Sequence, residues 1–302
     1  MNIKIGTLSL LACLTSLIYA QSGSPNISIE SVLRWNTMEL VSTVKLDLTS
    51  AGLKLPTGRA RSEELLDIEF PRIVSPYLFS IPVDSSTTIE RAIQLGQLSM
   101  LDMDNVVGSA QRTPAVLDMA QNSLMRNITV PLTDLSALLV RHQKPAPVPR
   151  PLIPQEAKNY TGILIFAQDM LSIYGRPGTA RLVPCLFPKI WDTAGALVYE
   201  RNMVDPELAK SKGIVRYTSA DQVLQKTPSG IAPAFQDLIG ERPLRILADK
   251  VFGILPTDPV ISKDDAAVLL SSDHNRRLLT EGRVLIVLAP EVLVQQVAGP
   301  AP

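Results

Sequence analysis

Five prolines fall within ten residues near the middle of the chain, at Pro145, Pro147, Pro149, Pro151 and Pro154. Proline fixes its own φ angle and lacks a backbone donor, so this spacing favours an extended, polyproline-like segment. Such a segment cannot join a helix or a central strand. We therefore expect a domain boundary, or at least a long surface crossing. The predicted organisation is an N-terminal domain over 31–142, a Pro-rich linker over 143–157 and a C-terminal domain over 158–290.

The first twenty residues have the pattern of a secretory signal peptide. Lys4 precedes an apolar stretch over 5–18, and Ala20 then stands before Gln21 as a cleavage site. The stretch is too short for a comfortable membrane span. A signal peptide over 1–20 places the mature protein in the periplasm or outside the cell. An alternative is lipidation at Cys13, which follows Leu-Leu-Ala as in a lipobox and would tether the protein to a membrane.

Composition excludes several classes of partner. The 302 residues carry 29 basic and 29 acidic side chains, so net charge gives no electrostatic case for binding nucleic acid. After the leader, no stretch is long and apolar enough to span a membrane. Cys185 has no intrachain partner once the leader is removed, so the fold must rest on its core. With 46% hydrophobic residues, the chain can supply that core.

Strand and helix patterns alternate before the linker. Met38 to Leu48 has alternate apolar and polar residues, which is typical of a half-buried strand. A helix is expected over 60–67, ended or bent by Pro71. The remaining expected elements are a helix opened by Thr87 and Thr88 through Leu95, a strand over 127–130, and a helix over 134–141 capped by Thr133.

After the linker the strand signal is stronger. Buried strands are expected over 160–167 and 283–288, a hairpin joins 186–191 to 196–199, and further strands are expected over 213–217 and 244–252. One helix opens at Ser262 and stops at Gly282. These patterns predict an α+β fold of two small domains, with largely antiparallel sheets, packed helices and a C-terminal tail over 291–302.

The residues that could carry chemistry have structural interpretations. Ser271 to His274 brings together the residue types of a catalytic triad, but consecutive positions on one helix point about 100° apart. Asp169 and Asp192 could form a glycosidase pair, although nothing selects them. The acidic residues Asp258, Asp264 and Asp265 lack the spacing of a calcium loop. We predict no catalytic, cofactor-binding or metal-binding residue, and hence no enzyme and no cofactor. Three aromatic residues, Trp35, Trp191 and Phe187, are predicted to be core or interface anchors.

The second domain carries a resemblance. Tyr160 to Ile165, Pro184 to Asp192, Gly195 to Tyr199 and Gly213 to Tyr217, together with three later blocks up to Val287, resemble poorly characterised bacterial envelope proteins. These are similar to FlgP-type lipoproteins and periplasmic flagellar assembly proteins, some of which build rings or disks around the flagellar motor. The resemblance covers roughly 158–289 and implies an assembly role without catalysis.

Three functional hypotheses follow. The first is an exported, non-catalytic structural or assembly component of the cell envelope, with protein partners or self-assembly and a possible place at the flagellar motor. The second is a periplasmic ligand-binding or chaperone-like module whose ligand sits between the two domains. The third is a hydrolase that uses Asp169 and Asp192.

Overall fold

Alternating apolar and polar side chains build the sheet of the first domain. The computed structural model describes residues 26–54, 57–151, 153 and 156–297, so the predicted leader with Cys13, Ala20 and Gln21 lies outside the described residues. Strands β1 (Ile27–Arg34), β2 (Glu39–Asp47) and β5 (Ser123–Pro131) pair antiparallel, with β2 in the middle. Every second residue of β2 is buried, which confirms the predicted strand.

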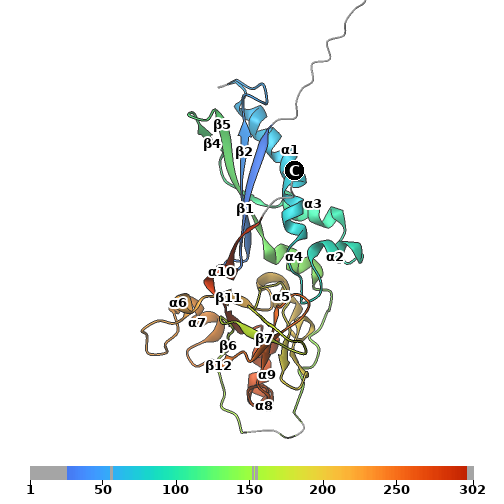
Figure 1. Ribbon diagram of the computed structural model, residues 1–302, viewed down its shortest axis with the longest axis vertical. Coiled ribbons are helices and arrows are strands. Elements are labelled where there is room, and N and C mark those ends of the chain that lie inside the picture. The colour runs from blue at the N-terminus through green and yellow to red at the C-terminus, as the bar shows by residue number, and fades with distance from the viewer. Residues whose placement is uncertain (1–25, 55–56, 152, 154–155, 298–302) are drawn as a thin grey trace, which may run out of the picture.

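Helix α1 (Arg59–Phe79) runs along the buried face of this sheet (Figure 1). Of the two outcomes predicted at Pro71, an end of the helix is wrong, because 21 residues form one helix with Pro71 and Pro76 inside it. An interior proline costs a helix about 3 kcal/mol. Val74, Tyr77 and Leu78 continue the buried stripe past Pro71. Burying each of these side chains contributes roughly 1.5–3 kcal/mol, so together they offset the roughly 6 kcal/mol cost of the two interior prolines.

Three shorter helices complete the first domain, together with β3 (Gln111–Arg112) and β4 (Val116–Asp118), which pair with β5. Helix α2 (Ile89–Gln94) begins where Thr88 accepts a hydrogen bond from the Arg91 backbone N–H, which confirms the predicted start. Helix α3 (Met100–Gly108) follows. Helix α4 (Leu132–Leu139) has Pro131 at its N-cap, so the predicted capping role of Thr133 is wrong.

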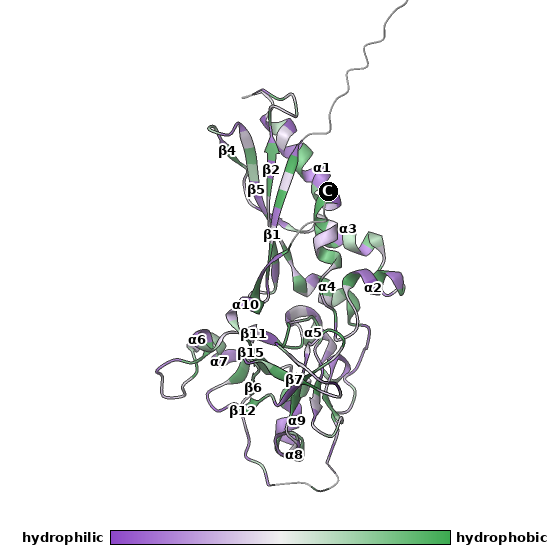
Figure 2. Ribbon diagram, in the orientation of Figure 1, coloured by the Kyte–Doolittle hydropathy of each residue, from purple (hydrophilic) through white to green (hydrophobic). Residues whose placement is uncertain are grey.

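The core of the second domain is a parallel sheet. Its order is β11 (Arg216–Thr218), β15 (Val284–Val287), β6 (Ile163–Phe166) and β12 (Leu244–Leu247), all parallel. Strands β6 and β15 are hydrophobic along their whole length (Figure 2). Parallel strands need helical crossovers that cover both faces, which explains such continuous apolar runs. Helices α6 (Ala220–Val223) and α7 (Pro233–Ile239) pack on one face.

A mixed sheet lies beside the parallel one. Its order is β10 (Leu197–Tyr199), β9 (Ile190–Asp192), β14 (Asp258–Ile261), β13 (Lys250–Phe252), β7 (Leu171–Ile173) and β8 (Thr179–Ala180). The predicted hairpin is β9 with β10. The expected strand over 244–252 is two strands, β12 and β13, in different sheets. The chain is therefore α+β with two small domains. Antiparallel pairs prevail over the whole chain, while the second domain contains many parallel ones.

The remaining helices of the second domain are short. They are η1 (Arg201–Met203), α5 (Pro206–Lys212), α8 (Lys263–Ser271) and α9 (Asp273–Thr280). Ser262 caps α8 as predicted, by accepting a hydrogen bond from the Asp265 N–H. The single predicted helix is broken at Ser272, whose hydroxyl accepts a hydrogen bond from the Asn275 N–H and so starts α9. Among the described residues, no helix has the length and apolar character needed to cross a membrane.

The C-terminal segment returns to the first domain. Helix α10 (Pro290–Leu293) leads into β16 (Val294–Val297), which pairs antiparallel with β1, Val297 opposite Ser31 and Val294 opposite Arg34. The prediction of a tail over 291–302 is thus wrong for 291–297, and 298–302 lie outside the described residues. A strand from the end of the chain closes an edge of the first sheet.

The Pro-rich segment is a strap on the second domain. Its described part runs down one side of that domain (Figure 1). The Ala146 N–H donates to the Asn202 carbonyl over 2.6 Å. Arg150 lies 3.5 Å from the Asp273 carboxylate. The segment therefore crosses the surface of the second domain while it connects the two domains.

Candidate functional site

The predicted aromatic anchors lie where the two domains meet. Trp35 is fully buried, and its ring meets the Tyr217 ring of β11 edge to face, with the centroids 5.9 Å apart. Its backbone N–H donates to the Leu293 carbonyl over 2.8 Å. Phe187 is also buried, and its N–H donates to the Val83 carbonyl over 2.8 Å. Trp35 and Phe187 are therefore anchors between the two domains of one chain.

A loop of the first domain penetrates the second. Residues 81–88 lie between α1 and α2, and the Leu186 N–H donates to the Pro82 carbonyl over 3.0 Å. The Leu255 N–H donates to the Ser85 carbonyl over 2.9 Å. Gly253 approaches Ser85 so closely that an added Cβ would lie 2.5 Å from the Ser85 Cβ. The two domains are packed together by backbone as well as by side chains.

Asp258 is the buried carboxylate of this junction. It accepts hydrogen bonds from the Lys189 N–H at 3.1 Å, the Trp191 indole N–H at 3.1 Å and the Thr257 hydroxyl at 3.0 Å. Burial raises the pKa of Asp258, and these hydrogen bonds partly offset the rise. A carboxylate that already accepts from several donors fixes neighbouring loops in place. Trp191, the third predicted anchor, thereby holds β9 to β14.

Cys185 and Tyr217 form a second buried pair at the junction. The Tyr217 hydroxyl donates to the Cys185 carbonyl over 2.8 Å, and the Cys185 N–H donates to that hydroxyl over 3.2 Å. Burial is the main cause that raises the pKa of the Cys185 thiol. A thiol held protonated is a poor nucleophile, because the thiolate is the reactive form. Cys185 thus packs as a small buried residue.

The other residues with chemical potential are engaged separately. Asp192 accepts hydrogen bonds from the Ala194 and Ala196 N–H groups, both over 2.8 Å, and so holds the turn between β9 and β10. His274 is exposed, and its Nε2 lies 2.7 Å from the Tyr160 carbonyl. Asp169 is exposed. Within the described part of the chain, no three His, Cys, Asp or Glu side chains gather as a metal site would require.

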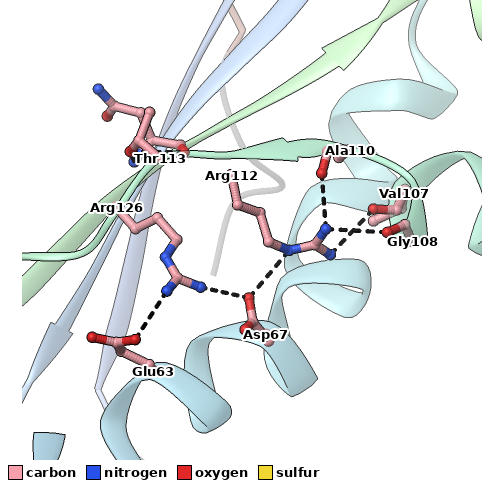
Figure 3. Close-up of polar contacts among 9 residues, drawn as sticks. Glu63, Asp67, Val107, Gly108, Ala110, Arg112, Thr113 and Arg126 are labelled. Carbon is pink, nitrogen blue, oxygen red and sulfur yellow. Dashed lines mark hydrogen bonds and ion pairs between the residues drawn. The ribbon is translucent and has the colours of Figure 1, made fainter. Parts of the chain in front are cut away.

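An ion network fastens α1 to the sheet, and the sequence reasoning missed it. Arg126 of β5 lies on the buried face, where it contacts Asp67 at 2.8 Å and Glu63 at 3.3 Å, both on α1 (Figure 3). Arg112 of β3 contacts Asp67 at 3.2 Å. Two signals were present in the sequence: a charge at a buried position of β5, and two acids four residues apart on one helix.

The Arg112 side chain links this network to α3. Its guanidinium donates to the carbonyls of Gly108 at 3.1 Å and Ala110 at 2.8 Å, where α3 ends (Figure 3). Cations stabilise the C-terminal end of a helix, because its last carbonyls lack intrahelical partners. The network therefore joins α1, α3, β3 and β5. Its geometry is that of a structural fastening.

The opposite face of the first sheet is open. Helices α1, α2 and α3 all lie on one side of β1, β2 and β5 (Figure 1). On the other side, residues opposite one another in register form an uncharged row across five strands: Gln296, Val32, Val41, Thr129 and Gln111. The row has partly or fully exposed side chains. Charged residues flank this row on the same face, with Glu30 two positions before Val32 and Arg34 opposite Glu39. An uncharged strip with a charged rim suits contact with another protein.

Comparison with known proteins finds two similarities. Residues 26–138 match the family described as Treponema pallidum Tp0624, N-terminal domain. Residues 162–290 match the family described as Treponema pallidum Tp0624, second domain. The two matched segments lie on either side of the Pro-rich strap. Their order in the chain, N-terminal domain and then second domain, is the order that the family descriptions give. No curated protein matches the chain.

Proposed function

We propose that this chain is an exported, non-catalytic structural or assembly component of the bacterial cell envelope. The observation that carries the proposal is the open face of the first sheet. The other face of this sheet is held to α1 by the Arg126 ion network. The uncharged row over β16, β1, β2, β5 and β3 offers an exposed strip to a neighbouring protein. The pattern of the first twenty residues supports export.

The residues that could take part in catalysis are occupied by structural hydrogen bonds, which supports a non-catalytic role. Asp258, Cys185 and Asp192 each hold the backbone or side chain of a neighbouring loop in place. Functional sites tend instead to leave a nucleophile or a base facing a cleft. The extensive contacts between the two domains further support the role of a rigid structural component. Trp35, the loop 81–88 and β16 all cross between the domains.

The native mass of the protein tests the proposal. Gentle release from the envelope with mild detergent, followed by crosslinking and light scattering, should give a defined assembly larger than the 32.9 kDa chain. Substitution Val41→Lys places a charge in the middle of the row and should dissociate that assembly. A matched control is Ile68→Lys, at a position on α1 that is 59% exposed, which should leave the mass unchanged.

Two results would remove the assembly role. One is a monomer in the released material. The other is an assembly that Val41→Lys and Ile68→Lys affect equally. The flagellar motor is the first system to test, because the resemblance of the second domain points there. A clean deletion that leaves motility and envelope integrity unchanged would end the flagellar version of the proposal.

A further inference from the structure

A pocket opens where the two domains meet, beside the buried junction. Its volume is about 200 Å³, and it is lined by Gln97, Leu139, Arg141 and His142 of the first domain and the strap, and by Arg201 and Asn202 of η1. This is below the roughly 300–1,000 Å³ of pockets for drug-sized ligands. It suits a single compact chemical group. Three of the six lining residues have basic side chains and none is an acid.

Arg201 is the cation that faces this pocket from the second domain. Its guanidinium lies over the Phe187 ring, 4.7 Å from the centroid, and is half-buried. Within the described part of the chain, it makes no hydrogen bond and no ion pair. Burial lowers the pKa of Arg201, and the charges of Asp84 and Glu200 offset this in part. A guanidinium in this state keeps planar donors available for an anion.

His142 lines the same pocket, and its ring is fixed by a contact with the second domain. Its Nε2 lies 2.8 Å from the Val204 carbonyl, which can only accept, so Nε2 carries a proton. Its Nδ1 is buried and has no hydrogen-bond partner. Buried polar atoms without partners are uncommon and often mark a bound water or ion.

Arg141 adds the second guanidinium. One of its terminal nitrogens donates to the Gln97 carbonyl, which ties the start of the strap to the turn between α2 and α3. The side chain is exposed, so its remaining donors are free to turn toward a ligand. The two guanidinium groups and the Gln97 carboxamide supply more donors than a carboxylate, with its two oxygens, can satisfy.

We propose that this junction pocket binds a phosphate-class oxyanion, held between Arg141 and Arg201 with His142 beside it. A tetrahedral anion with three or four acceptor oxygens matches a set of donors that come from both domains. The cleft formed by α5, α7 and the starts of β11 and β15 is a weaker candidate, because Asp237 and Glu281 line it together with its cations. The proposal is independent of the assembly role and gives the ligand-binding hypothesis a specific site.

Calorimetric titration of the whole chain with inorganic phosphate, at constant ionic strength, tests this site. We expect saturable binding at millimolar phosphate or below. Arg201→Gln and Arg141→Gln should each weaken it at least tenfold, which corresponds to about 1.4 kcal/mol. Arg216→Gln, at an exposed arginine of the other cleft, is the matched control and should bind as the parent does. Urea unfolding of each variant verifies that it is folded.

Two further probes identify the anion. Glycerol phosphate competes with inorganic phosphate if the pocket takes the phosphate group of a larger molecule, and fails to compete if it takes only the free ion; either result supports the site. Acetate tests the chemical class, and binding as tight as that of phosphate would overturn the phosphate assignment. The proposal is also overturned if the parent chain does not bind phosphate, or if both arginine variants bind as the parent does.

Discussion

The ion network between α1 and the first sheet makes an asymmetric prediction. Arg126 is the buried member, with 9% of its side chain exposed, whereas the Glu63 and Asp67 side chains are 32% and 42% exposed. Its Nε atom is buried and already has no partner. The cost of breaking such a network depends on which charge is left behind. Removing the arginine should therefore cost less than removing the two acids.

The magnitudes follow from the remaining contacts. In Arg126→Met, Asp67 keeps Arg112 at 3.2 Å and Glu63 keeps Arg59 at 3.1 Å, while the methionine retains the apolar stem. Partly exposed ion pairs contribute roughly 0.2–1 kcal/mol each, so we expect a loss of about 1 kcal/mol. The double variant Glu63→Gln/Asp67→Asn leaves Arg126 buried without a countercharge. Stranding a buried charge costs about 3–5 kcal/mol, and we expect the lower end, because the amide oxygens still accept hydrogen bonds.

Urea unfolding measures both free energies, for a chain that begins at Gln21. A third variant combines all three substitutions and should be more stable than Glu63→Gln/Asp67→Asn, because the stranded charge is then gone. Equal slopes of free energy against urea would verify that the variants differ in stability alone. The reasoning is refuted if Arg126→Met destabilises as much as the acid double variant. It is also refuted if adding Arg126→Met to that variant brings no recovery.

Four other predictions concern the junction and the strap. In a chain from Gln21, the Cys185 thiol should resist an aromatic disulfide reagent in buffer and react at once in urea; rapid labelling of the folded chain would contradict its burial. Because burial raises the pKa of Asp258, the folded state keeps a proton that the unfolded state has released above the ordinary carboxyl pKa of about 3.9. The stability of the parent relative to Asp258→Asn should thus be highest below that pH and fall as pH rises through the folded pKa of Asp258. A urea midpoint of the parent that rises relative to that of the variant as pH increases would exclude the raised pKa. Gly253→Ala should lower the free energy of unfolding by more than 2 kcal/mol, because the new Cβ would lie 2.3 Å from the Leu255 carbonyl at a positive φ; an unchanged urea midpoint would count against the close approach. Protease should cut first between 142 and 155, yet the nicked halves should elute together from a sizing column, and their separation would argue against a shared core.

Features set by neighbouring residues could be predicted from the sequence. Alternation alone places Leu40, Val44 and Leu46 on the buried face of β2. Ser262 and Thr88 cap helices because a hydroxyl at that position reaches an N–H two or three residues on. Each of these inferences needs information from a few adjacent positions only.

Features set by distant partners could not be predicted in this way. Pro71 is a helix breaker by local rules, and only the sheet beneath α1 explains why the helix continues. The four residues of β16 carry no signal that names β1 as their partner across the whole chain. The junction pocket joins Arg141 to Arg201, which are sixty positions apart in sequence. Its donors become a site only when η1 and the strap come together.

Strand β16 and the loop 81–88 explain why the two matched domains do not form separate folded units. Strand β16 lies outside both matched segments, 26–138 and 162–290, yet it pairs with β1 of the first domain. Without it, Ser31 to Arg34 of β1 would lie at a bare edge with unpaired N–H and C=O groups, which favours aggregation. The loop 81–88 makes the reciprocal contribution to the second domain. Each domain thus supplies a piece that the other needs, so the folded unit is the pair, and a surface or pocket that draws on both belongs to the chain as a whole.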